Sequence, residues 1–300
     1  MRKKFLAQLS LSLSLLIALG ANSLVAQTLQ RSQVPALNQT ERLVLSLPKD
    51  TEVLEVETGE MRYYQLLEQP GRAQALGGII LLPDPFSERH WLLQTHALRR
   101  YLAEQGWLTL VVEPPAPPHR PADALTQGEN LAAVTERFQQ SSLQRLENAL
   151  NEFTTFDPDI YIVIAFGRSS SAASRFVTER QNANRPLHLI LLDAEELISG
   201  DRTLDQYLLE IEGVVIDLHR QEREQAARSR QRLAQRHEVS GYHRQGLRAS
   251  LEAGWQEEMP WLQRQLRGLI EQQILIPFQE QAERAESAET PNDQRPPGRR

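Results

Sequence analysis

The stretch Ile160-Tyr161-Ile162-Val163-Ile164-Ala165-Phe166-Gly167-Arg168-Ser169-Ser170-Ser171-Ala172 decides how this chain folds. Its first half is an unbroken apolar run, which predicts a strand buried on both faces of a sheet. The Gly/Ser turn that follows ends the strand and starts a helix. A buried strand, a sharp turn and a helix form the repeating unit of a parallel sheet covered by helices.

The same alternation continues along the chain on both sides of this stretch. Buried strands are expected at Gly78–Leu82, Trp107–Val112, Leu187–Leu192, Val214–Leu218 and near 241–247, with helices between them and a closing helix from Pro260. Ahead of them, three short stretches alternate apolar and polar residues and are expected to be strands, Leu43–Leu47, Val53–Val56 and Arg62–Leu67.

This order of elements predicts an α/β protein with a mostly parallel central sheet and helices on both faces. No G-x-G-x-x-G follows the first buried strand, and the sequence contains no Walker motif. The leading antiparallel strands and the closing helix therefore favour an α/β-hydrolase-like fold over a dinucleotide-binding one.

The first residues predict export. Arg2-Lys3-Lys4 precede a short apolar run that serines interrupt, and small residues follow it. This is the pattern of a secretory signal peptide, here residues 1–26 with cleavage after Ser23 or Ala26. The alternative is a retained membrane anchor, but a span needs about 20 apolar residues.

The remainder divides into three parts. Residues 27–41 form a polar lead-in, 42–278 the α/β-hydrolase-like domain, and 279–300 a polar, charged tail that is expected to be disordered. The predicted location is the periplasm, and the membrane is contacted only through the signal segment.

Composition excludes several classes of chemistry. The chain has no cysteine, which excludes disulfides, thiol catalysis, Cys-ligated zinc and a lipid anchor on cysteine. The formal charge of −6 becomes about −9 when the three basic residues of the signal leave, so nucleic acid is not expected as a partner. The histidines show no metal-ligand spacing, and no cofactor is expected. The expected partner is therefore an unknown small molecule or envelope component, and the sequence does not predict the oligomeric state.

The turn after Ala165 leaves two registers open for a nucleophile of the G-x-S-x-G type. With Gly167 as the first glycine, Ser169 is the nucleophile and Ser171 replaces the last glycine. With Ala165 as the first small residue, Gly167 takes the nucleophile position and no side chain can attack.

A catalytic serine also needs a histidine and an acid. In this architecture the base follows the last strand, but no histidine follows it here, and His243 lies within or before that strand. The acid could be Glu222, whereas Asp217 inside a strand is expected to be structural. Because a positioned base contributes about 10²–10⁴ in rate, the sequence argues against an efficient triad.

Other roles for the same residues stand beside catalysis. The serines from Ser169 to Ser171 could cap the following helix. Arg168 and Ser170 at that helix start could bind an anion. Asp84 and Asp193 each follow a strand, where open α/β sheets bind ligands.

Several short motifs resemble one uncharacterised family of exported bacterial α/β-hydrolase-like proteins, a domain of unknown function. They span roughly Glu52 to Glu271 and include Leu81-Leu82-Pro83-Asp84, His90-Trp91, Gly106-Trp107-Leu108-Thr109-Leu110, Leu191-Leu192-Asp193-Ala194, Val215-Ile216-Asp217-Leu218, Tyr242-His243-Arg244-Gln245 and Leu266-Arg267-Gly268-Leu269. The resemblance implies the fold and export, and it favours Gly167 at the nucleophile position. This chain departs from the family in having Ser169 and Ser170 where small glycines are expected, and in lacking the downstream histidine.

The sequence thus predicts an exported α/β-hydrolase-like protein without a standard Ser-His-Asp triad, acting in binding or in an envelope role. The alternative is an atypical serine esterase or acyl hydrolase that uses Ser169 with Glu222.

Overall fold

The computed structural model describes residues 39–49, 51–58, 61–117, 131–181, 186–197, 202–248 and 259–289. The predicted signal peptide, nearly all of the lead-in and residues 290–300 lie outside the described residues. The chain divides into two compact units, Met1–Leu47 and Pro48–Arg300.

In the first unit the structure describes one short helix, α2 (Gln39–Val44), where the sequence predicted a strand at Leu43–Leu47. That prediction was wrong. The alternating pattern shows which side chains could share a face, but a strand also needs a neighbouring strand for its backbone groups. A helix satisfies those groups locally, and here Ser46 Oγ and Ser46 N–H both donate to the carbonyl of Leu43 at its end.

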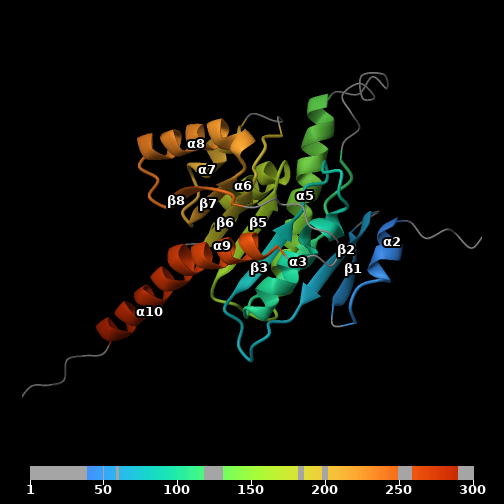
Figure 1. Cartoon of the computed structure of the whole chain (residues 1–300), viewed down its shortest axis with the longest axis horizontal. Coiled ribbons are helices and arrows are strands. Elements are labelled where there is room, and N and C mark those ends of the chain that lie inside the picture. Colours follow the sequence, from blue (N-terminus) through green and yellow to red (C-terminus); the bar gives the residue numbers. More distant parts are fainter. Residues whose placement is uncertain are drawn as a thin grey trace, which may run out of the picture. The chain divides into compact units, whose positions relative to one another are not determined.

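The second unit contains one sheet of eight strands in the order β1-β2-β4-β3-β5-β6-β7-β8 (Figure 1). The first two joins, β1 with β2 and β2 with β4, are antiparallel, and all the later joins are parallel. The predicted fold class is therefore confirmed. The strands are β1 (Glu52–Thr58), β2 (Met61–Glu68), β3 (Gly78–Leu82), β4 (Leu108–Val112), β5 (Tyr161–Phe166), β6 (Leu187–Leu192), β7 (Val215–His219) and β8 (Tyr242–Gly246).

Helices cover both faces of this sheet. The helix α3 packs against α9 on one face, whereas α5, α6, α7 and α8 follow one another across the other face (Figure 1). Their bounds are α3 (Trp91–Glu104), α5 (Leu131–Phe153), α6 (Ser169–Glu179), α7 (Leu204–Leu208), the 3₁₀ turn η1 (Gln221–Arg223), α8 (Glu224–Arg236), α9 (Pro260–Ile270), the π-helical turn η2 (Glu271–Leu275) and α10 (Ile276–Glu289).

The core follows from the period-two alternation of the strands. In β3, Ile80 and Leu82 belong to the cluster that contains Phe153 of α5 and Phe176 of α6. Their neighbours in β3 are equally buried and face the opposite side of the sheet, toward α3 and α9. Burial on both faces explains why the sequence shows unbroken apolar runs at these strands.

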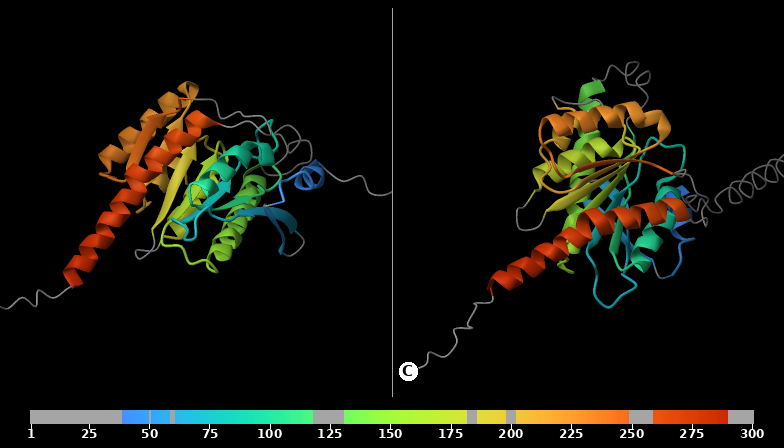
Figure 2. Two further views of the ribbon diagram at one scale, coloured as in Figure 1. Left: turned by 60° about the horizontal axis from the view of Figure 1, so that its bottom comes forward. Right: turned by 60° about the vertical axis from the view of Figure 1, so that its left-hand side comes forward.

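The predicted disordered tail, residues 279–300, was wrong in its first part, because α10 extends to Glu289. The composition from Gln279 onward predicted disorder, but the helix runs on to Glu289 and continues α9 through the π turn (Figure 2). Its Gln, Glu, Ala and Arg residues are strong helix formers, and Arg284 pairs with Glu280 one turn before it. The low hydrophobicity of this segment means that it has few side chains to pack against the core, but its residues still have a high helix propensity. No helix among the described residues is long and apolar enough to span a bilayer.

Candidate functional site

The turn between β5 and α6 places Gly167 where the chain reverses direction. Gly167 has a positive φ of 50°, which a glycine adopts without strain. Its N–H donates to the carbonyl of Leu192, and its own carbonyl accepts from the N–H of Glu195, both at 3.0 Å. The turn is therefore tied to the end of β6. Of the two registers left open by the sequence, the geometry matches the one with Gly167 at the nucleophile position.

The side chain of Asp84 lies directly against this glycine. Leu82 in β3 pairs with Ala165 in β5, so Asp84 and Gly167, each two residues further on, emerge side by side from the sheet. A Cβ atom added to Gly167 would overlap Asp84 Oδ2. The carboxylate thus fills the space that a nucleophilic side chain would need.

Backbone N–H groups from two different turns hold this carboxylate. The N–H of Phe86 donates to Asp84 Oδ1 at 2.9 Å, and the backbone N–H of Arg168 also binds the carboxylate. In α/β hydrolases, the N–H after the nucleophile and one from the loop after the third strand form the oxyanion hole. Here the corresponding pair of donors is occupied by a carboxylate of the chain itself.

Burial raises the pKa of Asp84 above its ordinary value, because desolvation disfavours the charged form. The N–H groups of Phe86 and Arg168 and the Arg168 charge act in the opposite direction, whereas the nearby charge of Glu195 adds to the increase.

Gln94 in the first turns of α3 locks the loop that carries Asp84. Its Oε1 accepts from the N–H of Asp84 at 2.9 Å, and its Nε2 donates to the carbonyls of Asp84 and Arg89 at 2.8 and 2.9 Å. One buried side chain thus satisfies three backbone groups. The backbone of the loop that carries Asp84 is therefore fixed.

Ser169 and Ser170 lie in the first turn of α6 and point into the protein. Ser169 is 2% exposed, and its Oγ donates to the carbonyl of Pro83 at 2.7 Å. The sequence predicted that Ser170 could bind a ligand. In the structure Ser170 is fully buried and does not line the cavity. The predicted serine cap was also wrong, because Arg168 is the N-cap residue and makes no side-chain cap hydrogen bond.

The structure does not bring Glu222 to Ser169. Glu222 lies in η1 after β7, is exposed, and has no described contact with that serine. Asp217, expected to be structural, is confirmed as such. It is fully buried and forms an ion pair with Arg230 of α8, while Tyr242 donates a hydrogen bond to it.

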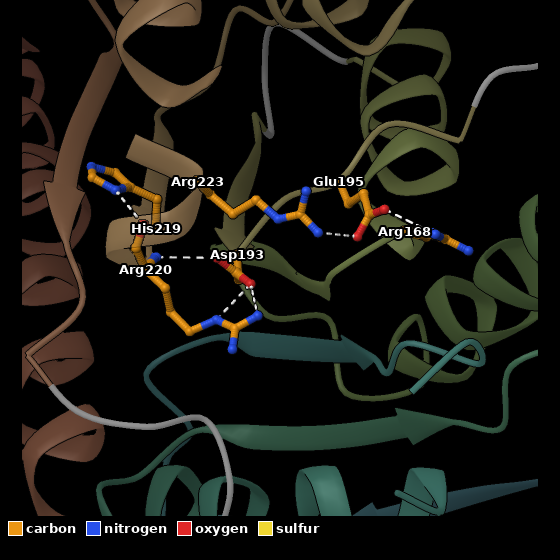
Figure 3. A network of polar contacts seen from close by, with 6 residues as sticks. All are labelled: Arg168, Asp193, Glu195, His219, Arg220 and Arg223. Carbon is orange, nitrogen blue, oxygen red and sulfur yellow. Dashed lines mark hydrogen bonds and ion pairs between the residues drawn. The ribbon is translucent and has the colours of Figure 1, made fainter. Parts of the chain in front are cut away.

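Ion pairs connect the turns after β5, β6 and β7 (Figure 3). Glu195 Oε1 accepts from Arg168 at 2.9 and 3.1 Å, and its Oε2 binds Arg223. Asp193 accepts from the N–H and from the guanidinium of Arg220, the latter at 2.6 and 2.7 Å. Arg168 is therefore already neutralised by Glu195, which argues against the anion site predicted for it.

A cavity of about 440 Å³ opens at this edge of the sheet. It contains both acidic residues predicted to bind a ligand, Asp84 and Asp193, but neither Ser169 nor Ser170. Its lining residues are Asp84, Ser87, Glu88, Arg89, Gln94, Phe166, Gly167, Leu192, Asp193 and Arg220.

None of the histidines that the structure describes lines this cavity. His219, at the end of β7, comes nearest in sequence to the ion-pair network. Arg244 donates to its Nε2 at 2.9 Å, so its Nδ1 carries the proton and donates to the carbonyl of Arg220. Both ring nitrogens are engaged, and His219 is not free to act as a base. No group of three or more potential metal ligands occurs among the described residues.

The family model for proteins of unknown function DUF3530 matches residues 6–143 and 134–272 of this sequence. The chain belongs to the DUF3530 family. No curated protein matches the chain.

Solved structures similar to this DUF3530 protein are α/β hydrolases. Est1E from Butyrivibrio proteoclasticus aligns with a TM-score of 0.52 at 11% identity, covering 74% of this chain and 98% of its own. A dienelactone hydrolase from Anabaena variabilis aligns with a TM-score of 0.50 at 12% identity, covering 75% and 96%. At such identities the likeness establishes the α/β-hydrolase fold alone.

Three residues of this site were not predicted from the sequence, namely Gln94, Glu195 and Arg220. Each is polar and lies within a turn of a strand's carboxyl end or at the start of a helix, but so do many surface residues. Their roles depend on contacts between turns that are far apart in sequence, for which the sequence carries no local signal.

Proposed function

We propose that this protein is an exported, periplasmic α/β-hydrolase-like protein that binds a ligand at the carboxyl edge of its sheet without hydrolysing it through a Ser-His-Asp triad. The observation that carries the proposal is the pair Gly167 and Asp84. The nucleophile position has no side chain, and a carboxylate occupies both its space and the two N–H donors beside it.

The chemistry of acyl transfer supports this view. Removing a single oxyanion-hole donor costs about 10²–10³ in rate, and here both donors are engaged by Asp84. The alternative nucleophile, Ser169, is buried with its hydroxyl donated to Pro83, and no described histidine contacts it. Nothing in this geometry favours the atypical esterase.

The proposed export rests on the sequence. The basic start, the short apolar run and the small residues up to Ala26 are those of a cleaved signal peptide. Amino-terminal sequencing of the protein from envelope fractions tests this part. A chain beginning at Leu24 or Gln27 is expected, whereas a chain that still begins at its first residues would mean a retained anchor.

Hydrolysis is tested with a fluorophosphonate probe and short acyl esters, on the mature protein from mildly acidic to mildly basic pH. We expect neither labelling nor turnover. Ser169→Ala and Ser170→Ala form a matched pair, because both remove a buried hydroxyl from the first turn of α6. Labelling that vanishes in Ser169→Ala but persists in Ser170→Ala would overturn the proposal and establish the serine esterase.

A further inference from the structure

We infer that the cavity at the carboxyl edge binds its ligand through a cationic amino group, with the carboxylate of Asp84 as the anchor. The inference rests on the proposed binding function and specifies the ligand class. Four observations carry it: the pairing of the charges, the rigidity of Asp84, the lining of the cavity, and the absence of a metal-binding cluster among the described residues.

Three of the arginines at this edge already have carboxylate partners, and a fourth, Arg89, lines the cavity. Arg168 and Arg223 share Glu195, and Arg220 is held by Asp193 (Figure 3). In contrast, Asp84 forms no ion pair with any described residue, although its carboxylate lines the cavity. The charge of Arg168 also acts on Asp84 but is shared with Glu195, so the Asp84 carboxylate is only partly compensated, and a ligand of positive charge complements it.

Asp84 is also held rigidly enough to act as an anchor. Its carboxylate accepts the N–H groups of Phe86 and Arg168, and Gln94 fixes the backbone around it. A carboxylate offers about four lone-pair sites, so two hydrogen bonds leave capacity for a further donor. Recognition groups held in place by neighbouring hydrogen bonds lose little entropy when a ligand binds.

The cavity lining favours a cation over an anion. Its charged lining residues are three acids and two arginines, Asp84, Glu88, Asp193, Arg89 and Arg220. Because Arg220 is paired with Asp193, an anionic ligand placed against Asp84 would still meet like charge at close range. An ammonium ion there favours the ionised carboxylate and offsets its burial. The net charge of −6 adds long-range attraction for cations.

An organic cation fits this site better than a metal ion. Ca²⁺ and Mg²⁺ take six or more oxygen ligands, several of them from carboxylates. No group of three or more potential metal ligands exists among the described residues, and Asp193 is already occupied by Arg220. A single fixed carboxylate suits an ammonium group with its three N–H donors.

Calorimetric titration of the mature protein with 1,4-diaminobutane tests the inference, with 1,4-butanediol and succinate as neutral and anionic probes of equal carbon chain length. We expect binding of the diamine only. Asp84→Asn removes the charge and should weaken diamine affinity at least tenfold. Asp205→Asn is the matched control, since Asp205 is a partly buried carboxyl on α7 outside the cavity, and it should change affinity less than twofold.

A second measurement does not depend on any variant folding. In ¹⁵N-labelled wild-type protein, the diamine should shift the backbone amide resonances of Phe86, Gly167 and Arg168, and succinate should not. Absent shifts, equal binding of the diamine by Asp84→Asn, or tighter binding of succinate would each overturn the inference. Fluorophosphonate labelling would instead refute the proposed function, so the two failures are distinguishable.

Discussion

The carboxylate of Asp84 occupies the space that a side chain at residue 167 would require. The two residues leave neighbouring parallel strands at the same level, and each constrains the other. Gly167 can hold its positive φ and leave room for the carboxylate, while Asp84 accepts the N–H of the residue that follows Gly167. This turn thus places a carboxylate, held by backbone N–H groups, directly beside a glycine.

Gly167→Ala should lower the free energy of unfolding by about 2 kcal/mol or more, because alanine at positive φ is strained and its Cβ overlaps Asp84. In the double variant with Asp84→Ala the overlap disappears, so the two effects should be non-additive by about 1 kcal/mol in urea unfolding. Gly268→Ala is the control. A Cβ there meets nothing within 4 Å inside α9, and helix propensity should raise stability by about 0.5–1 kcal/mol. Strict additivity at 84 and 167 would contradict the described contact.

Gln94→Leu should cost about 2–4 kcal/mol in unfolding free energy, because it removes three hydrogen bonds to part-buried backbone groups of Asp84 and Arg89. Gln140→Leu is the matched control, since Gln140 is exposed and makes one side-chain hydrogen bond with Glu136. It should change stability by less than about 0.5 kcal/mol. Equal effects of the two variants would mean that Gln94 does not fix the loop.

Asp217→Asn should destabilise the protein by about 3–5 kcal/mol, because it leaves the buried charge of Arg230 without its counter-ion. Tyr242→Phe removes one hydrogen bond to the same carboxylate and should cost about 1–2 kcal/mol. Arg284→Ala breaks an exposed ion pair in α10 and should cost less than about 0.5 kcal/mol. Thermal unfolding of the three variants measures the order of these stability losses. A loss for Asp217→Asn as small as that for Arg284→Ala would contradict a buried ion pair between Asp217 and Arg230.

Burial lowers the pKa of His188 from 6.5 to about 4. The unfolded chain therefore binds a proton below about pH 6.5 while the folded protein does not until about pH 4. Stability is lost as the pH falls through that window, by about 3 kcal/mol in total. His188→Asn keeps an acceptor for the N–H of Val214 and should remove this part of the pH dependence.

Unfolding free energies at pH 7 and pH 4.5 measure the effect. His237→Asn, at the exposed end of α8, is the control and should follow the wild type between these two pH values. If His188→Asn lost stability as steeply as the wild type, burial of the imidazole would not be the cause.

The strands and helices that carry the site could be predicted because their signals are local. The buried runs at β3, β5 and β6 and the glycine after α3 mark elements through apolar periodicity and backbone preference alone. The same reasoning failed at α2, where strand-like alternation had no partner strand, and at α10, where polarity concealed a strong helix propensity.

The sequence by itself determined the α/β-hydrolase fold class and placed Asp84 and Asp193 at the carboxyl edge, since both follow buried strands. Only the tertiary structure decided that Gly167 occupies the turn, that Asp84 fills the space beside it, and that Arg168 is paired with Glu195. The physical reason is that elements arise from interactions between near neighbours in the chain. The site arises where strands distant in sequence pair and bring their ends together.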